Sequence, residues 1–182
     1  MRRASTVLVL AVSAALALGG CGVGASTVVS PPPVPSDTPT ATVTTAVAQT
    51  RGAIAAALAA GGVAAPLGDA TRPYRPAESA RLRDAPRAVY QVQIPDQPDA
   101  GFIVVYEFPD TASAVDAGNE EAGYLGTGPA KVQFPPDAEH VLQAVGTTLV
   151  LYTWSPTASS DPTAGMVAGA LKPLGIGFTV PS

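Results

Sequence analysis

The chain has 182 residues and a net charge of −4, with 14 acidic side chains against 10 basic ones. This acidic balance disfavours nucleic acid as a partner, because phosphate binding requires clustered positive charge. The single cysteine excludes a disulfide within the chain, so packing alone must hold the core.

The first twenty residues have the layout of a signal peptide. A short basic segment, Met1–Arg3, precedes the uncharged stretch Ala4–Gly20. A permanent span needs about 20 apolar residues and usually anchoring flanks, so this stretch is short for a spanning helix. We therefore predict a signal peptide over residues 1–20.

The apolar stretch ends in Leu18-Gly19-Gly20-Cys21, which resembles the lipobox of bacterial lipoproteins, with a leucine three positions before the cysteine and small residues between. In that family the cysteine thiol receives a diacylglyceryl group, and the peptide bond before it is then cut. The resemblance implies lipidation of Cys21 and attachment to the extracytoplasmic face of the cell membrane. The alternative is an ordinary secretory signal or an uncleaved anchor, in which this cysteine has no role.

Residues 22–44 consist almost entirely of Ser, Thr, Pro, Val, Ala and Gly, with five prolines in Pro31–Pro39 and Asp37 as the one charge. Such a segment cannot bury enough apolar surface to offset the entropy lost on ordering. We predict that residues 21–44 form a lipidated cysteine and a disordered stalk that acts as a spacer. A stalk that crosses the cell wall or is glycosylated is the alternative.

Residues 45–182 are long enough for one domain with its own core. The first predicted element is a helix over Thr45–Ala60, which Gly61-Gly62 ends. Its apolar face is formed by Val47, Ile54 and Leu58. Two prolines interrupt residues 63–74, so this segment holds an edge strand at best.

Five of the eight basic residues that follow Cys21 gather in one segment: Arg72, Arg75, Arg81, Arg83 and Arg87. One interpretation is a contact for lipid head groups or an acidic polymer, because each cation near an anionic membrane contributes about 1 kcal/mol. The other is a solvated loop whose arginines balance carboxylates of the domain itself.

Strand patterns follow this segment. Apolar residues alternate with glutamines in Ala88–Ile94, as in a half-buried strand. The stretch Phe102–Phe108 is apolar on both faces except at Glu107, which predicts a central strand covered on both sides. The turn-rich residues 95–101 join the two strands into a hairpin.

Asp110 is placed to cap a helix that runs from Thr111 to about Ala122. Its predicted inward face consists of Ala112, Val115 and Ala122, and its acids Asp116, Glu120 and Glu121 are interpreted as a solvated face rather than a calcium site. Residues 123–129 are expected to form a loop, and Lys131–Phe134 a brief strand.

A second hairpin is predicted from His140–Val145 and Thr148–Trp154, with a tight turn between them. Asp161 then caps a helix over Pro162–Lys172, whose predicted inner side consists of Met166, Val167, Ala170 and Leu171. A short strand or tail, Ile176–Val180, closes the chain.

This order predicts a single α+β domain, with a mainly antiparallel sheet of two hairpins and two to three helices packed on it. Two stretches, Val104–Asp110 and Leu149–Tyr152, resemble corresponding parts of a group of small bacterial lipoproteins, over roughly residues 50–174. Proteins of that group have no assigned activity, so the resemblance implies no catalytic residue.

The only histidine, His140, lies close in sequence to Asp137 and Glu139. A catalytic interpretation makes it the general base of an envelope hydrolase, oriented by either carboxylate. The alternative is a surface histidine at the start of a strand. A zinc site usually draws three or four ligands from His and Cys, so one histidine and an acylated cysteine predict no metal, and we expect no cofactor.

Four aromatic residues lie on the predicted strands: Tyr90, Tyr106, Tyr152 and Trp154. One interpretation is a sheet face whose tyrosine and tryptophan side chains bind a peptide or a glycan through stacking and hydroxyl contacts. An aromatic core beneath the helices is the alternative. We select Tyr152 and Trp154, with the five clustered arginines, as candidate binding residues.

The sequence thus predicts a membrane-tethered, monomeric, non-enzymatic binding or accessory domain of the cell envelope, with a protein or glycan partner. An envelope hydrolase that uses His140 with Asp137 or Glu139 is the competing hypothesis. A purely structural or inhibitory lipoprotein is the third.

Overall fold

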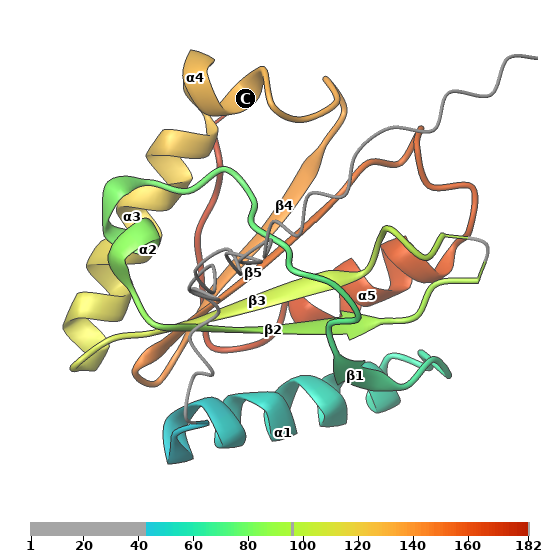
Figure 1. The fold of residues 1–182 in the computed structure, drawn as a ribbon, viewed down its shortest axis with the longest axis horizontal. Coiled ribbons are helices and arrows are strands. Elements are labelled where there is room, and N and C mark those ends of the chain that lie inside the picture. The colour runs from blue at the N-terminus through green and yellow to red at the C-terminus, as the bar shows by residue number, and fades with distance from the viewer. Residues whose placement is uncertain (1–42, 96, 182) are drawn as a thin grey trace, which may run out of the picture. The chain divides into compact units, whose positions relative to one another are not determined.

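A six-stranded antiparallel sheet forms the centre of the structure, a computed structural model that describes residues 43–95 and 97–181 (Figure 1). The strands are β1 Leu67–Asp69, β2 Arg87–Val92, β3 Phe102–Glu107, β4 Glu139–Val145, β5 Thr148–Trp154 and β6 Ile176–Gly177. Their order in the sheet is β1-β2-β3-β5-β4-β6, and every neighbouring pair is antiparallel.

Helices cover both faces of this sheet. They are α1 Thr45–Ala60, α2 Ala80–Asp84, α3 Thr111–Leu125, α4 Gly128–Lys131 and α5 Thr163–Leu171. One apolar cluster joins the sheet to α1 and α5, and a second joins it to α2, α3 and α4. Figure 1 shows α1 and α3 on opposite sides of the strands. The fold is therefore a single α+β domain built around the two predicted hairpins, as the sequence indicates.

The first helix forms over the predicted residues. The Thr44 side chain accepts a hydrogen bond from the Val47 amide at 3.2 Å and so caps the first turn. All three predicted apolar positions of α1 are buried against the sheet. At the other end Gly61 lies so close to α5 that a Cβ there would be 2.8 Å from the Ala170 Cβ, and Gly62 has a φ of 73°.

Strand β3 is the central strand that the sequence predicts. Ile103 and Val105 belong to the cluster under α1 and α5, whereas Val104 and Tyr106 belong to the cluster under α3. All four side chains are fully buried, because the strand has strands on both sides and helices on both faces. The two hairpins meet at the pairing of β3 with β5.

The remaining strands agree with the pattern of the sequence. β4 and β5 form the second hairpin through Gly146, whose φ of 60° suits the tight turn. Among the described residues, β1 is an edge strand that pairs with β2 alone, and β6 lies at the other edge, where it pairs with β4.

One predicted strand is wrong. Residues 131–134 form no strand in the structure, and α4 lies at Gly128–Lys131, where the sequence predicts a loop. Pro129 suits the first turn of a helix, and the Lys131 amide donates to the Thr127 carbonyl at 2.9 Å. Val132, an apolar position of the expected strand, is 82% exposed.

Two helix faces also differ from prediction. The helix α3 is capped by Asp110 as expected, but Ala112 is exposed and the inward face consists of Ala114, Ala117, Gly118, Glu121, Ala122 and Leu125. The buried Glu121 contradicts the expected solvated acidic face. In α5, Met166 is exposed whereas the other three predicted inner residues are buried.

The predicted signal peptide, Cys21 and the stalk up to residue 42 lie outside the described residues. Within the described part of the chain, no helix combines the length and the apolar character needed to cross a membrane.

Candidate functional site

A pocket of about 440 Å³ lies at the end of the sheet where β5 extends beyond its last pair with β3, Tyr152 with Ile103. Five of the ten aromatic residues of the chain line it: Tyr74, Phe102, Phe134, Tyr152 and Trp154. Its volume falls in the range of roughly 300–1,000 Å³ that is usual for small-molecule sites. We call this site the aromatic pocket.

Stacked rings form one wall of the aromatic pocket. The rings of Tyr74 and Phe102 lie 4.4 Å apart between centroids and 7° from parallel. The Arg72 guanidinium carbon lies 5.1 Å from the centroid of the Phe102 ring, and the same guanidinium pairs with Asp99 at 3.0 Å. Stacking and the cation–π contact fix the orientation of these rings before any ligand arrives.

A buried glutamine holds the loop that forms the rim. The Gln91 side-chain nitrogen donates to the carbonyls of Pro98 and Ala100 at 2.9 and 2.8 Å. Gly101 closes this loop with a φ of 80°, where a Cβ would collide with the Val92 carbonyl oxygen. The rim therefore depends on Gln91, which the sequence marks only as a polar position in a strand of alternating polar and apolar residues.

A further part of the lining comes from β5 and α5. The Tyr152 hydroxyl donates to the Ala164 carbonyl at 3.1 Å, and burial raises the pKa of this phenol, so it stays protonated. Trp154 is half-buried and packs over Gly165, where a Cβ would lie 3.1 Å from the indole ring. The indole nitrogen of Trp154 is buried and has no hydrogen-bond partner among the described residues.

His140 contacts two residues that line the aromatic pocket. Its Nδ1 lies 2.9 Å from the Thr153 hydroxyl, and its ring meets Phe134 edge-on at 4.9 Å between centroids. Burial lowers the pKa of His140, so the ring is neutral at pH 7. Its two contacts are residues of the pocket lining, and His140 itself is not part of that lining.

Asp137 orders the loop that follows Trp154. Its carboxylate accepts hydrogen bonds from the Ser155 hydroxyl at 2.8 and 2.9 Å, and from the Thr157 amide and hydroxyl at 2.8 Å each. The Thr157 contacts hold the pKa of Asp137 below its usual range, so the carboxylate is ionised at pH 7.

The three residues of the hydrolase hypothesis are held apart by these contacts. Glu139 pairs with Lys172 at 3.8 Å, and no hydrogen bond or ion pair joins His140 to Asp137 or Glu139 in the described part of the chain. Among residues 43–95 and 97–181, no group of three or more His, Cys, Asp and Glu side chains is placed to hold a metal ion. The hydrolase therefore stays a prediction that none of these contacts favours.

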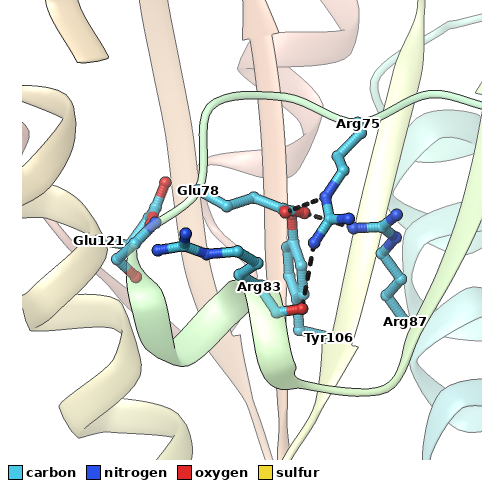
Figure 2. A network of polar contacts seen from close by, with 7 residues as sticks. Arg75, Glu78, Arg83, Arg87, Tyr106 and Glu121 are labelled. Carbon is cyan, nitrogen blue, oxygen red and sulfur yellow. Dashed lines mark hydrogen bonds and ion pairs between the residues drawn. The ribbon is translucent and has the colours of Figure 1, made fainter. Parts of the chain in front are cut away.

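The clustered arginines mostly pair with carboxylates of the domain. Figure 2 shows Arg75 and Arg87 converging on the buried Glu78, with ion-pair distances of 2.7 Å each. The Tyr106 hydroxyl donates to the same carboxylate at 2.8 Å. Burial and this carboxylate raise the pKa of Tyr106. These pairings agree with the interpretation in which the clustered arginines balance carboxylates of the domain itself.

The remaining two arginines of this group lie on α2. Arg81 pairs with Glu120 of α3 at 3.1 Å, and Arg83 has no ion pair among the described residues. Of the candidate binding residues, Tyr152 and Trp154 thus come together in the pocket lining, with Arg72 at its rim through Asp99, whereas Arg75 and Arg87 come together at Glu78.

Sequence reasoning missed Tyr74, Phe102 and Phe134 as site residues. Tyr74 and Phe134 lie outside the strands of the structure. The strand expected over residues 131–134 marked Phe134 only as an apolar position, and Phe102 reads as one more apolar residue of a central strand. The only signal was the small number of aromatic residues. The small number of aromatic residues points to a site once the fold shows that half of them line one pocket.

The fold and the site together define an α+β domain with an aromatic pocket at one end of its sheet. Comparisons with protein-family models, curated proteins and solved structures find no match to this chain. The resemblance to small bacterial lipoproteins accordingly stays a prediction.

Proposed function

We propose that this protein is a lipid-anchored, extracytoplasmic binding protein of the bacterial cell envelope, and that its domain holds a neutral sugar unit of an envelope glycan in the aromatic pocket. The observation that carries the proposal is the gathering of five of ten aromatic residues around one pocket. The chain acts by binding, and it carries out no reaction.

The charge of the lining favours a neutral ligand. Asp99 is the one charged residue of the lining, and Arg72 neutralises it at 3.0 Å. An ionic ligand would lose its hydration without gaining an opposite charge, which costs free energy. A neutral sugar has no such cost.

The chemistry of the lining favours a ligand with both apolar faces and hydroxyl groups. A sugar ring presents C–H faces that stack on aromatic rings such as Tyr74 and Phe134. Its hydroxyls match the polar side chains of the lining, which are Gln97, Thr153, Ser155 and Ser159.

The proposed anchor rests on Leu18-Gly19-Gly20-Cys21 and on the proline-rich segment that follows it. A lipidated Cys21 and a spacer would hold the domain at the membrane surface, within reach of the glycan outside. Replacement of Cys21 by serine is expected to release the protein from washed membranes into the soluble fraction. Unchanged partitioning and electrophoretic mobility of the variant would argue against lipidation.

Binding is testable through the one tryptophan, because Trp154 lines the pocket and its fluorescence reports on that site alone. Uncharged oligosaccharides released from purified cell walls are titrated into the Cys21→Ser chain. We expect saturable quenching or a spectral shift. Tyr74→Ala and Phe134→Ala should each weaken the affinity roughly 3- to 10-fold, the loss expected for one stacking contact.

Tyr124→Ala is the matched control, because Tyr124 is a half-buried tyrosine on α3 that lines no part of the pocket. It should leave the affinity unchanged, and circular dichroism confirms that all three variants fold. No saturable signal with any oligosaccharide, or equal affinities for all variants, would remove the glycan from the proposal.

A further inference from the structure

A second pocket, of about 530 Å³, lies along the outer edge of β4. Its lining includes both lysines of the chain, Lys131 and Lys172, and the only histidine. The other walls come from the end of α3 and from residues 178–181. This edge pocket shares only Phe134, Pro135 and Ala138 with the aromatic pocket, and no inference about it depends on glycan binding.

The outer edge of β4 is only partly covered by β6. The pairing joins Gln143 with Gly177 and Ala144 with Ile176, and a last hydrogen bond runs from the Phe178 amide to the Leu142 carbonyl at 3.0 Å. The chain then leaves β4, and Figure 1 shows its end close to α4. In the described part of the chain, residues 139–141 thus have no strand partner on this side.

The C-terminal segment is held away from β4 by α3. The Phe178 ring occupies the space over Gly118, where a Cβ would collide with it. Farther along, the chain passes Gly126, where a Cβ would lie 2.9 Å from the Pro181 carbonyl oxygen. These two glycines allow the segment to dock on α3, and the edge pocket lies between that segment and β4.

The free edge of β4 offers backbone hydrogen bonds. The N–H and C=O groups of neighbouring strand residues point to alternate sides, so those of His140 point to the same side as the Leu142 carbonyl, which bonds to Phe178. The N–H and C=O of His140 therefore face the open edge. Such an edge is a template for one further strand.

Two cations flank this edge from opposite faces of the sheet. Lys131 ends α4 on the α3 side, and Lys172 follows α5 on the other side. Lys131 has no ion pair among the described residues, and Lys172 approaches Glu139 only to 3.8 Å with both side chains exposed. An incoming carboxylate can engage the first lysine freely and compete for the second.

We propose that the edge pocket binds an extended acidic peptide, which pairs with β4 at His140 as an additional strand. Successive side chains of a strand point to opposite faces, so two neighbouring acidic residues reach Lys131 and Lys172 at the same time. Phe134, Phe178 and Val180 supply apolar contacts for the flanking side chains.

The test uses a short fluorescein-labelled peptide with a Glu-Asp pair between valines, and the Cys21→Ser chain. Fluorescence anisotropy should show saturable binding that weakens roughly 2- to 5-fold in each of Lys131→Gln and Lys172→Gln. Arg51→Gln is the matched control, because Arg51 is a cation on α1 outside both pockets and should leave the affinity unchanged. A peptide methylated at its backbone nitrogens should not bind, since strand pairing requires those N–H groups.

Three outcomes would overturn the proposal: no saturable binding, equal binding of the methylated peptide, or equal affinities for the lysine variants and the wild type. Dimerisation of the chain that the peptide does not displace would mean that a second copy occupies the edge, which also overturns it. Tyr74→Ala should bind the peptide normally, so a failure here is distinguishable from a failure of glycan binding.

Discussion

Glu78 and Glu121 are two buried carboxylates of the same region, held in different surroundings. Glu78 accepts hydrogen bonds from Arg75, Arg87 and Tyr106. One oxygen of Glu121 accepts the Ser79 amide at 2.8 Å, and its other oxygen is buried with no partner among the described residues. Figure 2 shows Glu121 on the side of Glu78 away from Arg75 and Arg87.

Because of this difference, Glu121 should make the stability of the fold depend on pH. Burial first, and then the nearby Glu78 and Glu120, raise the pKa of Glu121, against the lowering effect of the Ser79 amide. A group whose pKa is raised on folding stabilises the fold fully below its unfolded pKa of about 4.3. That contribution is lost as the pH rises through the raised pKa of the folded state.

We expect Glu121→Gln, which mimics the protonated side chain, to be more stable than the wild type near pH 7 and equally stable near pH 3, because both chains are then neutral at this position. Urea unfolding followed by Trp154 fluorescence across this pH range measures the difference. Glu120→Gln, a change at the exposed neighbour that pairs with Arg81, should show no such gain. A constant difference between Glu121→Gln and the wild type across the range would contradict the assignment.

The roles of single buried polar residues were beyond prediction from the sequence. Glu121 lies 42 residues from the amide it accepts, so its burial depends on how the segment before α2 docks on α3. Gln91 occupies an ordinary polar position of an alternating strand, and only the folded rim shows its two acceptors. The sequence shows which residues are polar, but tertiary packing decides which hydrogen-bond partners they meet.

Elements with local signals were predicted well. The helix α1 has its expected bounds because an N-cap threonine and two terminal glycines mark both ends. The strand expected at residues 131–134 failed because two apolar residues in alternation are too short a pattern to decide between helix and strand. For α3 the start was predicted, but its inward face only in part, because many of its small residues give little contrast between the two sides.

The cap of α3 gives a prediction for this element. The Asp110 carboxylate accepts the Ser113 amide at 2.7 Å, and this hydrogen bond lowers the pKa of Asp110. Asp110→Ala should lower the melting temperature by roughly 3–6 °C, whereas Asp110→Asn should lower it much less, since asparagine also caps helices. Differential scanning calorimetry at pH 7 makes the comparison. Equal losses in the two variants would show that the cap is not the cause.

For the whole molecule, the architecture predicts one cooperative unit, because β3 and β5 contribute to both apolar clusters. Ile103 lies in the cluster under α1 and α5, and Leu151 lies in the cluster under α3. Ile103→Ala and Leu151→Ala should each destabilise the fold by about 3 kcal/mol, the usual cost of a cavity at such a position.

Both changes should shift a single transition, seen at the same midpoint by Trp154 fluorescence and by circular dichroism of the helices. Met166→Ala is the control, because this side chain is 41% exposed and its loss should change stability by about 0.5 kcal/mol or less. Two separate transitions would show that the faces of the sheet unfold independently.

At this scale the fold class was predictable, but the aromatic pocket was not. The two hairpins are local and leave a clear trace in the sequence, whereas the pairing of β3 with β5 joins residues far apart in the chain. That pairing, together with the docking of the segments that carry Tyr74 and Phe134, brings the pocket residues together. No local sequence pattern predicts that these distant segments come together around one pocket.

The same pairing has a consequence for how fast the chain folds. Each hairpin joins two strands that follow one another in the chain, a step that takes microseconds, whereas β3 and β5 join residues such as Glu107 and Thr148 across the whole of α3. Loop-closure entropy must be lost before these contacts stabilise the chain, so we expect the pairing of β3 with β5, the seam between the hairpins, to set the folding rate. Substitutions along this seam should slow folding, and substitutions confined to the edge strands should mainly accelerate unfolding.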